Sequence, residues 1–163
     1  MPYPKLNQLY IYLTDGCNLA CRHCWIAPTF DGQGEHSSFL SVDRFAAIID
    51  EALELGLTAV KLTGGEPLLH PDFPELVRII GEKKLRLNVE TNGLLCDANI
   101  AKAISRVPHR FVAVSIDGTE AATHDWIRGV EGAFDQACAA VRYLKEAGIA
   151  PQIIMTVMRP NLD

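Results

Sequence analysis

The stretch Ala59-Val60-Lys61-Leu62, followed directly by Thr63-Gly64-Gly65-Glu66-Pro67, decides the fold class. Its first four residues are mostly apolar and are typical of a short strand, and the glycines and proline end that strand in a tight turn. Residues 41–55 before this stretch follow a helical period, and a second helical segment begins after it at Asp72. A strand between two helical segments indicates βαβ units and a parallel sheet.

The same alternation continues along the whole chain. The expected strands are 9–13, 59–62, 85–89, 111–116 and 153–158, and the expected helices are 41–55, a segment from Asp72, 97–106 and a segment around 134–144. Asp72 and Glu75 have capping-box spacing at the start of the second helix, and Lys83 and Lys84 are expected in its last turn. Five strands with four helical crossovers predict an α/β fold, a partial (β/α) barrel with parallel strands.

Composition restricts the class of protein further. The chain of 163 residues is expected to be one domain, with 1–8 as a lead-in and 9–158 as βα repeats. A formal net charge of −5 argues against nucleic acid or an anionic membrane as a partner. Because no apolar run approaches the roughly 18–20 residues that span a bilayer, the sequence predicts a cytoplasmic protein.

Three of the five cysteines lie close together, as Cys17-x3-Cys21-x2-Cys24 after the first expected strand. In a reducing compartment such a cluster indicates a metal site rather than a disulfide framework, and sulfur ligands favour iron–sulfur clusters, zinc or copper(I). Zinc would need a fourth protein ligand, which His23 or His36 could supply. A cubane iron–sulfur cluster normally takes four cysteines, so three would leave one iron open to a small molecule.

Polar or glycine-rich segments also follow the next three strands. These segments are Gly64–Pro67, Thr91-Asn92-Gly93 and Ser115-Ile116-Asp117-Gly118. Ligands of parallel α/β sheets bind at the carboxyl ends of the strands, so four unusual segments at this edge predict a site there. Each segment alone is also typical of an ordinary turn. Glu66 is expected to order its turn rather than to take part in chemistry.

Together, the cysteine spacing, the aromatic Trp25 and the Gly64-Gly65-Glu66-Pro67 turn resemble the signature of the radical S-adenosylmethionine (radical SAM) enzymes. The resemblance extends from about Leu9 to Val157 and implies a (β/α)6 core. It implies that Cys17, Cys21 and Cys24 bind a [4Fe–4S] cluster whose fourth iron is chelated by S-adenosylmethionine. Reductive cleavage of that cofactor would give a 5′-deoxyadenosyl radical for hydrogen abstraction, with flavodoxin or ferredoxin as the expected reductant.

The resemblance also assigns residues to the cofactor. The glycine turn would contact the methionyl amino group, and Ser115 and Arg128 would help to hold the cofactor, since a guanidinium suits a carboxylate. His23 and Trp25 would contact the adenine. The alternative for Arg128 is a solvated charge at a helix end. The complete predicted cofactor-binding set is His23, Trp25, Gly64, Gly65, Glu66, Pro67, Thr91, Asn92, Ser115, Asp117 and Arg128.

The Ser-x-Asp-Gly run and the later His124-Asp125-x-x-Arg128-Gly129 resemble the subgroup with a SPASM or twitch extension. This predicts a peptide or protein substrate, with tetrapyrrole or other small-molecule modification as the alternative. A non-catalytic zinc or iron–sulfur module is a third interpretation. Because the family core has six βα units, the C-terminal part is expected to be absent here, and further polypeptide or a second chain should cover residues 153–158.

The remaining candidates have simpler interpretations. Cys96 and Cys138 are expected to be structural, since Cys138 lies on the apolar side of its helix. Trp126 is expected to pack rather than to serve as a stacking platform. The three other histidines have no ligand spacing and are expected to be caps or surface residues: His70, His109 and His124.

Overall fold

Five parallel strands form the main sheet of the computed structural model, which describes residues 4–26, 29–30 and 38–162. They are β1 (Gln8–Tyr12), β4 (Ala59–Thr63), β5 (Arg86–Thr91), β6 (Arg110–Ser115) and β7 (Gln152–Ile154). Their order in the sheet, β1-β4-β5-β6-β7, is their order in the chain, and all four pairings are parallel. The predicted α/β partial barrel with five parallel strands is therefore confirmed.

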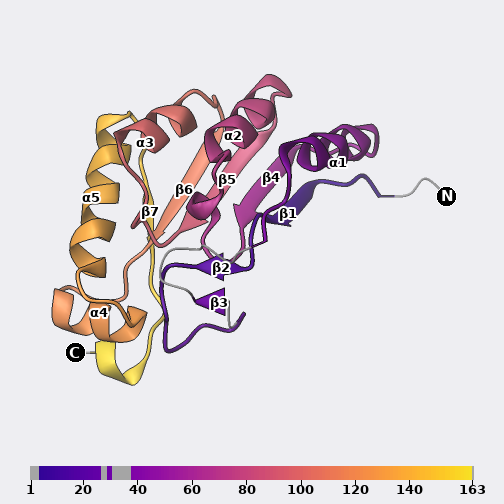
Figure 1. The fold of residues 1–163 in the computed structure, drawn as a ribbon. Coiled ribbons are helices and arrows are strands. Elements are labelled where there is room, and N and C mark those ends of the chain that lie inside the picture. The colour runs from indigo at the N-terminus through magenta and orange to yellow at the C-terminus, as the bar shows by residue number, and fades with distance from the viewer. Residues whose placement is uncertain (1–3, 27–28, 31–37, 163) are drawn as a thin grey trace.

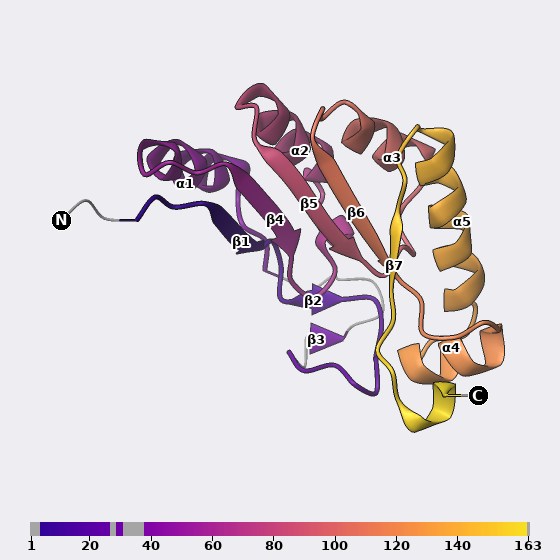
Figure 2. The same ribbon diagram turned by 180° about the vertical axis from the view of Figure 1, so that it is seen from behind.

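Helices cover one face of this sheet. The α-helices are α1 (Val42–Glu54), α2 (Phe73–Glu82), α3 (Ala98–Ser105), α4 (Ala121–Arg128) and α5 (Ala133–Glu146), and short 3-10 helices are η1 (Pro67–Leu69) and η2 (Arg159–Asn161). Figures 1 and 2 show α1, α2, α3 and α5 on the same side of the strands, while α4 and η2 lie near the ends of β6 and β7. A short parallel pair, β2 (Gly16–Cys17) and β3 (Thr29–Phe30), lies beside the main sheet.

The alternation of side chains along β1 explains which face is covered. Ile11 is buried and Leu9 packs against the core between sheet and helices, whereas Tyr10 and Tyr12 are exposed on the other face. Successive strand residues point to opposite faces, so each strand presents one face to the helices and one to the open side. Phe45 on α1 and its counterparts on the other covering helices complete the core.

The start and end of α2 differ from the sequence prediction. Asp72 makes no side-chain capping bond, because its backbone (φ −99°, ψ 24°) is not extended and its N–H donates to Nδ1 of His70. Glu75 instead pairs with Arg78 on the helix surface. Lys83 and its neighbour Lys84 lie beyond the last helical residue rather than in the last turn, so the capping-box and last-turn predictions are wrong.

The connection from β6 to β7 also differs. Two helices, α4 and α5, occupy it where the sequence predicted one, because α4 has only 8 residues and two of its three buried residues, His124 and Arg128, are polar. The last strand ends at Ile154 rather than at Met158. The chain leaves the sheet there because the backbone N–H of Thr156 donates to the side chain of Asp117 instead of to a strand.

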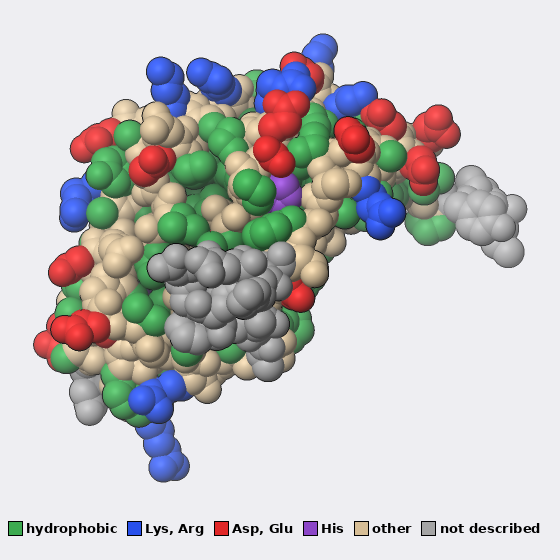
Figure 3. All heavy atoms as spheres, in the orientation of Figure 1, with side chains coloured by type: hydrophobic (Ala, Val, Ile, Leu, Met, Phe, Trp, Pro, Cys, Tyr) green, Lys and Arg blue, Asp and Glu red, His purple; other side chains and the backbone are tan. Residues whose placement is uncertain are grey.

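The surface of the covered side carries charges of both signs. Figure 3 shows Lys and Arg side chains interspersed with Asp and Glu side chains over the helices. Within residues 4–26, 29–30 and 38–162, no helix has the length and apolar character needed to cross a membrane.

Candidate active site

The three cysteines of the predicted motif gather around one hollow at the carboxyl ends of the strands. Cys17 is 6% exposed, and Cys21 and Cys24 are half-buried. The hollow has a volume of about 220 Å³, and all three cysteines line it. The other predicted residues that line it are His23, Trp25, Gly65, Glu66, Thr91, Asn92, Ser115 and Arg128. Thus the fold brings together eleven of the fourteen predicted site residues around this hollow, drawn from five chain segments.

Three predicted residues, Gly64, Pro67 and Asp117, do not line the hollow. Residues that sequence reasoning missed do line it, among them Thr63, Glu90, Ile154 and Thr156. Glu90 could have been found, because it directly precedes Thr91 at the end of the same strand. Thr156 could not have been found from the sequence, because its position depends on where the last strand leaves the sheet.

The Gly64–Gly65 turn fastens the cysteine loop to the sheet. The N–H of Gly65 donates to the carbonyl of Thr14 (3.1 Å), and the N–H of Glu66 donates to the carbonyl of Gly16 (2.9 Å). Gly64 has φ +133°, a conformation that residues with a side chain rarely adopt. The close approach that these glycines permit is therefore to the backbone of residues 14–16, just before the first cysteine.

Glu66 connects the turns after β4 and β5. Its buried carboxylate accepts from the N–H of Leu68 (3.0 Å), the hydroxyl of Thr91 (2.7 Å) and the N–H of Asn92 (2.8 Å). Burial raises the pKa of Glu66, and these three donors oppose the shift. The Glu66 side chain orders its own turn, as the sequence predicted, and also the turn after β5. The Thr91 hydroxyl donates its hydrogen bond to this carboxylate.

Asn92 links the turn after β5 to the cysteine loop. Its Nδ2 donates to Oδ1 of Asn18 (2.8 Å) and lies 3.9 Å from Sγ of Cys17. Burial raises the pKa of Cys17 to about 12, so binding a metal centre at this thiol must displace its proton.

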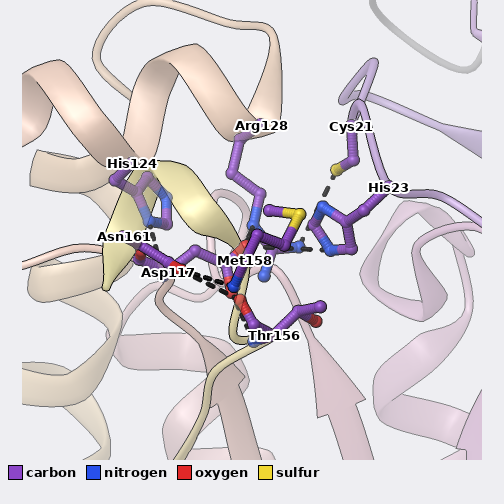
Figure 4. A network of polar contacts seen from close by, with 8 residues as sticks. All are labelled: Cys21, His23, Asp117, His124, Arg128, Thr156, Met158 and Asn161. Carbon is purple, nitrogen blue, oxygen red and sulfur yellow. Dashed lines mark hydrogen bonds and ion pairs between the residues drawn. The ribbon is translucent and has the colours of Figure 1, made fainter.

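Asp117, Arg128 and the half-buried His23 form a polar group beside Cys21 (Figure 4). Asp117 is fully buried, and its Oδ1 accepts from the N–H of Thr156 (2.8 Å). Its Oδ2 lies 2.9 Å from Nε of Arg128, in an ion pair that lacks hydrogen-bond geometry, and 3.8 Å from Nε2 of His23. Burial, reinforced by the Arg128 charge, lowers the pKa of His23. Arg128 is 8% exposed, so the solvated-charge alternative for it is wrong.

The end of α4 packs directly against the cysteine loop. The backbone N–H of Arg22 donates to the carbonyl of Ile127 (2.9 Å), and its Nε donates to the carbonyl of Trp126 (2.8 Å). The Arg22 guanidinium also lies 4.3 Å from the ring centroid of Trp126. Trp126 is therefore a stacking surface for an arginine of the same chain, rather than a packing residue alone.

The remaining candidates lie apart from the hollow. Cys96 is buried in the core and Cys138 packs against it. His124 is a buried acceptor for the N–H of Asp117 (3.1 Å) and not a surface residue. His70 is also buried, with Nε2 2.7 Å from the carbonyl of Leu40. His109 is exposed. His36, named above as a zinc ligand, lies outside the described residues.

The three thiols around the hollow are the ligand type that holds an iron–sulfur cluster. Each thiolate of a cubane cluster binds a different iron, so three cysteines would leave the fourth iron without a protein ligand. In the part of the chain that the structure describes, no three His, Cys, Asp or Glu side chains form a group that could hold one metal ion. The five parallel strands define this protein as a partial (β/α) barrel. The three cysteines that line the hollow at the edge of its sheet give it a candidate iron–sulfur site.

Comparison with known proteins identifies the family. The sequence model of the radical SAM superfamily matches residues 11–163, so this chain belongs to the radical SAM superfamily. Enzymes of this family use a [4Fe–4S] cluster and S-adenosylmethionine. The crystal structure of SuiB from Streptococcus suis bound to S-adenosylmethionine shares the fold, with a TM-score of 0.77 and 21% identity, over 91% of this chain and 33% of that one.

Two curated relatives have different functions. AdoMet-dependent heme synthase from Nitratidesulfovibrio vulgaris is 37% identical over 159 residues, which are 98% of this chain and 42% of that protein. Mycofactocin maturase MftC from Mycobacterium tuberculosis is 35% identical over 151 residues, which are 92% of this chain and 37% of that protein. The chain thus spans about two fifths of the length of these relatives.

Proposed function

We propose that this chain is the catalytic core of a radical SAM enzyme that modifies a tetrapyrrole. The observation that carries the proposal is the 37% identity to a heme synthase across 98% of the chain. This reverses the order of the two substrate classes favoured by the sequence motifs, in which peptide modification came first.

In this proposal Cys17, Cys21 and Cys24 bind three irons of a [4Fe–4S] cluster and leave the fourth open. When bound, the cluster supplies the electron that cleaves S-adenosylmethionine and so generates the radical that abstracts hydrogen. The backbone at Gly65, beside the thiols, supports the assignment of the Gly64–Pro67 turn to the methionyl amino group. Ser115 and Arg128 also line the hollow, which supports their assignment to the carboxylate.

The other predicted cofactor residues have divided roles. His23 and Trp25 line the hollow and stay assigned to the adenine, and Trp25 is 84% exposed. Glu66, Thr91 and Asn92 bond mainly to one another and to the cysteine loop. Asp117 does not line the hollow, and its proposed role is to hold Arg128 through their ion pair.

The substrate is proposed to lie on the open face of the sheet. Glu90 lines the hollow and also pairs with Lys61, whose Nζ lies 2.5 Å from the Glu90 carboxylate and 5.0 Å from the ring centroid of Tyr10. This polar and aromatic surface extends the hollow along β4 and β5. A flat substrate would find the aromatic rings of Tyr10 and Phe111 here, beside the ion pair of Lys61 and Glu90.

Peptide or protein modification is the second candidate. It is supported by the Ser-x-Asp-Gly run from Ser115, by Arg128, and by the 35% identity to mycofactocin maturase. The SPASM or twitch assignment belongs to this candidate, because it rests on the same residues.

The proposal also covers the domain bounds, the covering of β7, the reductant and the location of the protein. Residues 1–163 are assigned to one radical SAM core domain, with 1–8 as a lead-in and 9–158 as βα repeats. Further polypeptide or a second chain is proposed to cover β7, on which Ile153 is 60% exposed. A flavodoxin or ferredoxin is proposed as reductant, and the reduced thiols suit a cytoplasmic location.

Anaerobic iron and sulfide analysis of the reconstituted chain tests the cluster. We expect four irons and four sulfides per chain, as [4Fe–4S] stoichiometry requires, and loss of both in the Cys21→Ala variant. Cys138→Ala is the matched control, because Cys138 lies outside the hollow. Stoichiometric zinc in place of iron, or full iron loading of Cys21→Ala, would refute the assignment.

Substrate class is tested separately on the loaded protein. Added S-adenosylmethionine should change the electron paramagnetic resonance signal of the reduced cluster. Formation of 5′-deoxyadenosine should then be stimulated by an iron porphyrin with propionate side chains and not by cysteine- or tyrosine-containing peptides. Stimulation by peptides alone would favour the second candidate.

A further inference from the structure

Arg128 contacts the cysteine loop itself. Its Nη1 lies 3.7 Å from Sγ of Cys21, a donor–sulfur contact between residues 107 positions apart in the chain. Figure 4 shows the Arg128 side chain extending from α4 into the space between Cys21, His23 and Asp117. Arg128 as a residue is 8% exposed, so water screens its charge only weakly.

The surrounding residues fix this guanidinium in place. On one side Oδ2 of Asp117 lies 2.9 Å from Nε of Arg128. Asp117 is itself held by the N–H of Thr156 at its Oδ1, and its backbone carbonyl accepts from Nδ2 of Asn161 (2.9 Å). The backbone of α4 is held against the cysteine loop by the bond from Arg22 to Ile127. The contact with Cys21 is therefore built by several independent interactions.

A cation next to a thiolate ligand affects electron transfer to a cluster. One-electron reduction adds negative charge to a [4Fe–4S] cluster, and a buried positive charge stabilises the reduced form more than the oxidised form. Hydrogen bonds to the sulfur ligands are among the factors that set cluster potentials. Arg128 offers both a charge and an N–H donor at the same sulfur.

We propose that Arg128, positioned by Asp117, donates a charge-assisted hydrogen bond to the Cys21 thiolate and raises the reduction potential of the cluster. The inference rests on the proposed function, in which Cys21 is a cluster ligand. The electron comes from a one-electron, low-potential donor and enters the cluster, and no proton or bond changes place. This role adds to carboxylate binding, because Nε and Nη1 are engaged with Asp117 and Cys21 while Nη2 has no partner among the described residues.

A redox titration without S-adenosylmethionine separates this role from cofactor binding. The reconstituted wild-type chain and its variants are titrated anaerobically with dithionite, and the reduced cluster is measured by electron paramagnetic resonance. In Arg128→Gln we expect the equilibrium constant for reduction to fall at least tenfold, which corresponds to a midpoint about 59 mV more negative for one electron. Arg106→Gln, which removes an exposed arginine elsewhere, should leave the midpoint unchanged.

Two further variants complete the test. Arg128→Lys keeps the charge but not the planar fork that reaches Asp117 and Cys21 together, so it should give an intermediate midpoint. In an Asp117→Asn background, Arg128→Gln should shift the midpoint by less than it does alone, because Arg128 is no longer held.

Several outcomes overturn the inference. Midpoints of both Arg128 variants equal to the wild-type value overturn it and leave the proposed function intact. Loss of cluster iron from both variants also overturns it, because Arg128 would then be needed for assembly and not for tuning. A wild-type chain that binds no cluster refutes the proposed function as well.

Discussion

Gly65 and Gly16 pack backbone to backbone, so closely that a Cβ added to Gly65 would lie 1.9 Å from the carbonyl oxygen of Gly16. Gly65 follows β4, and Gly16 immediately precedes the first cysteine. The glycine that fixes the turn after β4 thus also fixes where the cysteine loop begins.

Replacing Gly65 should separate these two segments. We expect Gly65→Ala to lower the free energy of unfolding by about 1–3 kcal/mol, as overpacking of a filled site does, and to reduce cluster retention. Gly81→Ala is the matched control: its Cβ would meet Val107 at an ordinary 3.5 Å, and alanine should stabilise α2 by up to about 1 kcal/mol. Urea denaturation measures both, and equal stability of the two variants would contradict this account.

Glu66 should be more important to stability than its place in a loop suggests. Glu66→Gln keeps the acceptor for Leu68 and Thr91 at one oxygen but can turn an NH₂ group toward the N–H of Asn92. We expect a loss of about 1–3 kcal/mol in urea denaturation. Glu75→Gln, at a surface ion pair, should cost less than about 1 kcal/mol.

The effect of Glu66 should also depend on pH. Burial raises the pKa of Glu66, so the folded chain binds its proton more tightly than the unfolded chain does. The stability that Glu66 contributes relative to Glu66→Gln is then fully present below the ordinary glutamate pKa. It should decrease as pH rises through the raised value. Urea midpoints of both proteins from pH 4 to pH 8 measure this, and a difference that grows with pH would contradict it.

Cys96 should resist alkylation in the folded protein. Burial raises the pKa of Cys96 from 9.0 to about 12, which leaves roughly a thousandfold less thiolate than in a free thiol. Between pH 7 and pH 9 its reaction with iodoacetamide should rise about tenfold per pH unit without a plateau, and in urea it should reach the normal rate. Peptide mass spectrometry measures the modification, and equal folded and unfolded rates would show that the site opens.

The exposed apolar face of β7 should drive self-association of this chain. Ile153 is 60% exposed and Val157, just beyond the strand, is 67% exposed, and an apolar edge strand is a template for pairing with another chain. Ile153→Lys should lower the mass measured by light scattering at a fixed protein concentration. Leu162→Lys, at a comparably exposed residue outside the strand, should not. A wild-type chain that is already a stable monomer would remove the basis for this expectation.

The sequence by itself determined the alternation of strands and helices and the place of the chemistry along it. Strand and helix periods are local, and turn residues such as Gly64 and Pro67 end a strand wherever the strand lies. Since carboxyl ends of parallel strands meet at one edge, the positions of Cys17, Thr91 and Ser115 after three strands were enough to place them together.

The tertiary structure decided what depends on packing between distant segments. The burial of Arg128 and its contact with Cys21 require α4 to dock on the cysteine loop, which joins residues 107 positions apart in the chain. The same holds for Asp117, whose bond to the N–H of Thr156 ends the last strand early. Sequence periodicity reports which side of an element is apolar, whereas the partner of a buried charge is set only when the elements pack together.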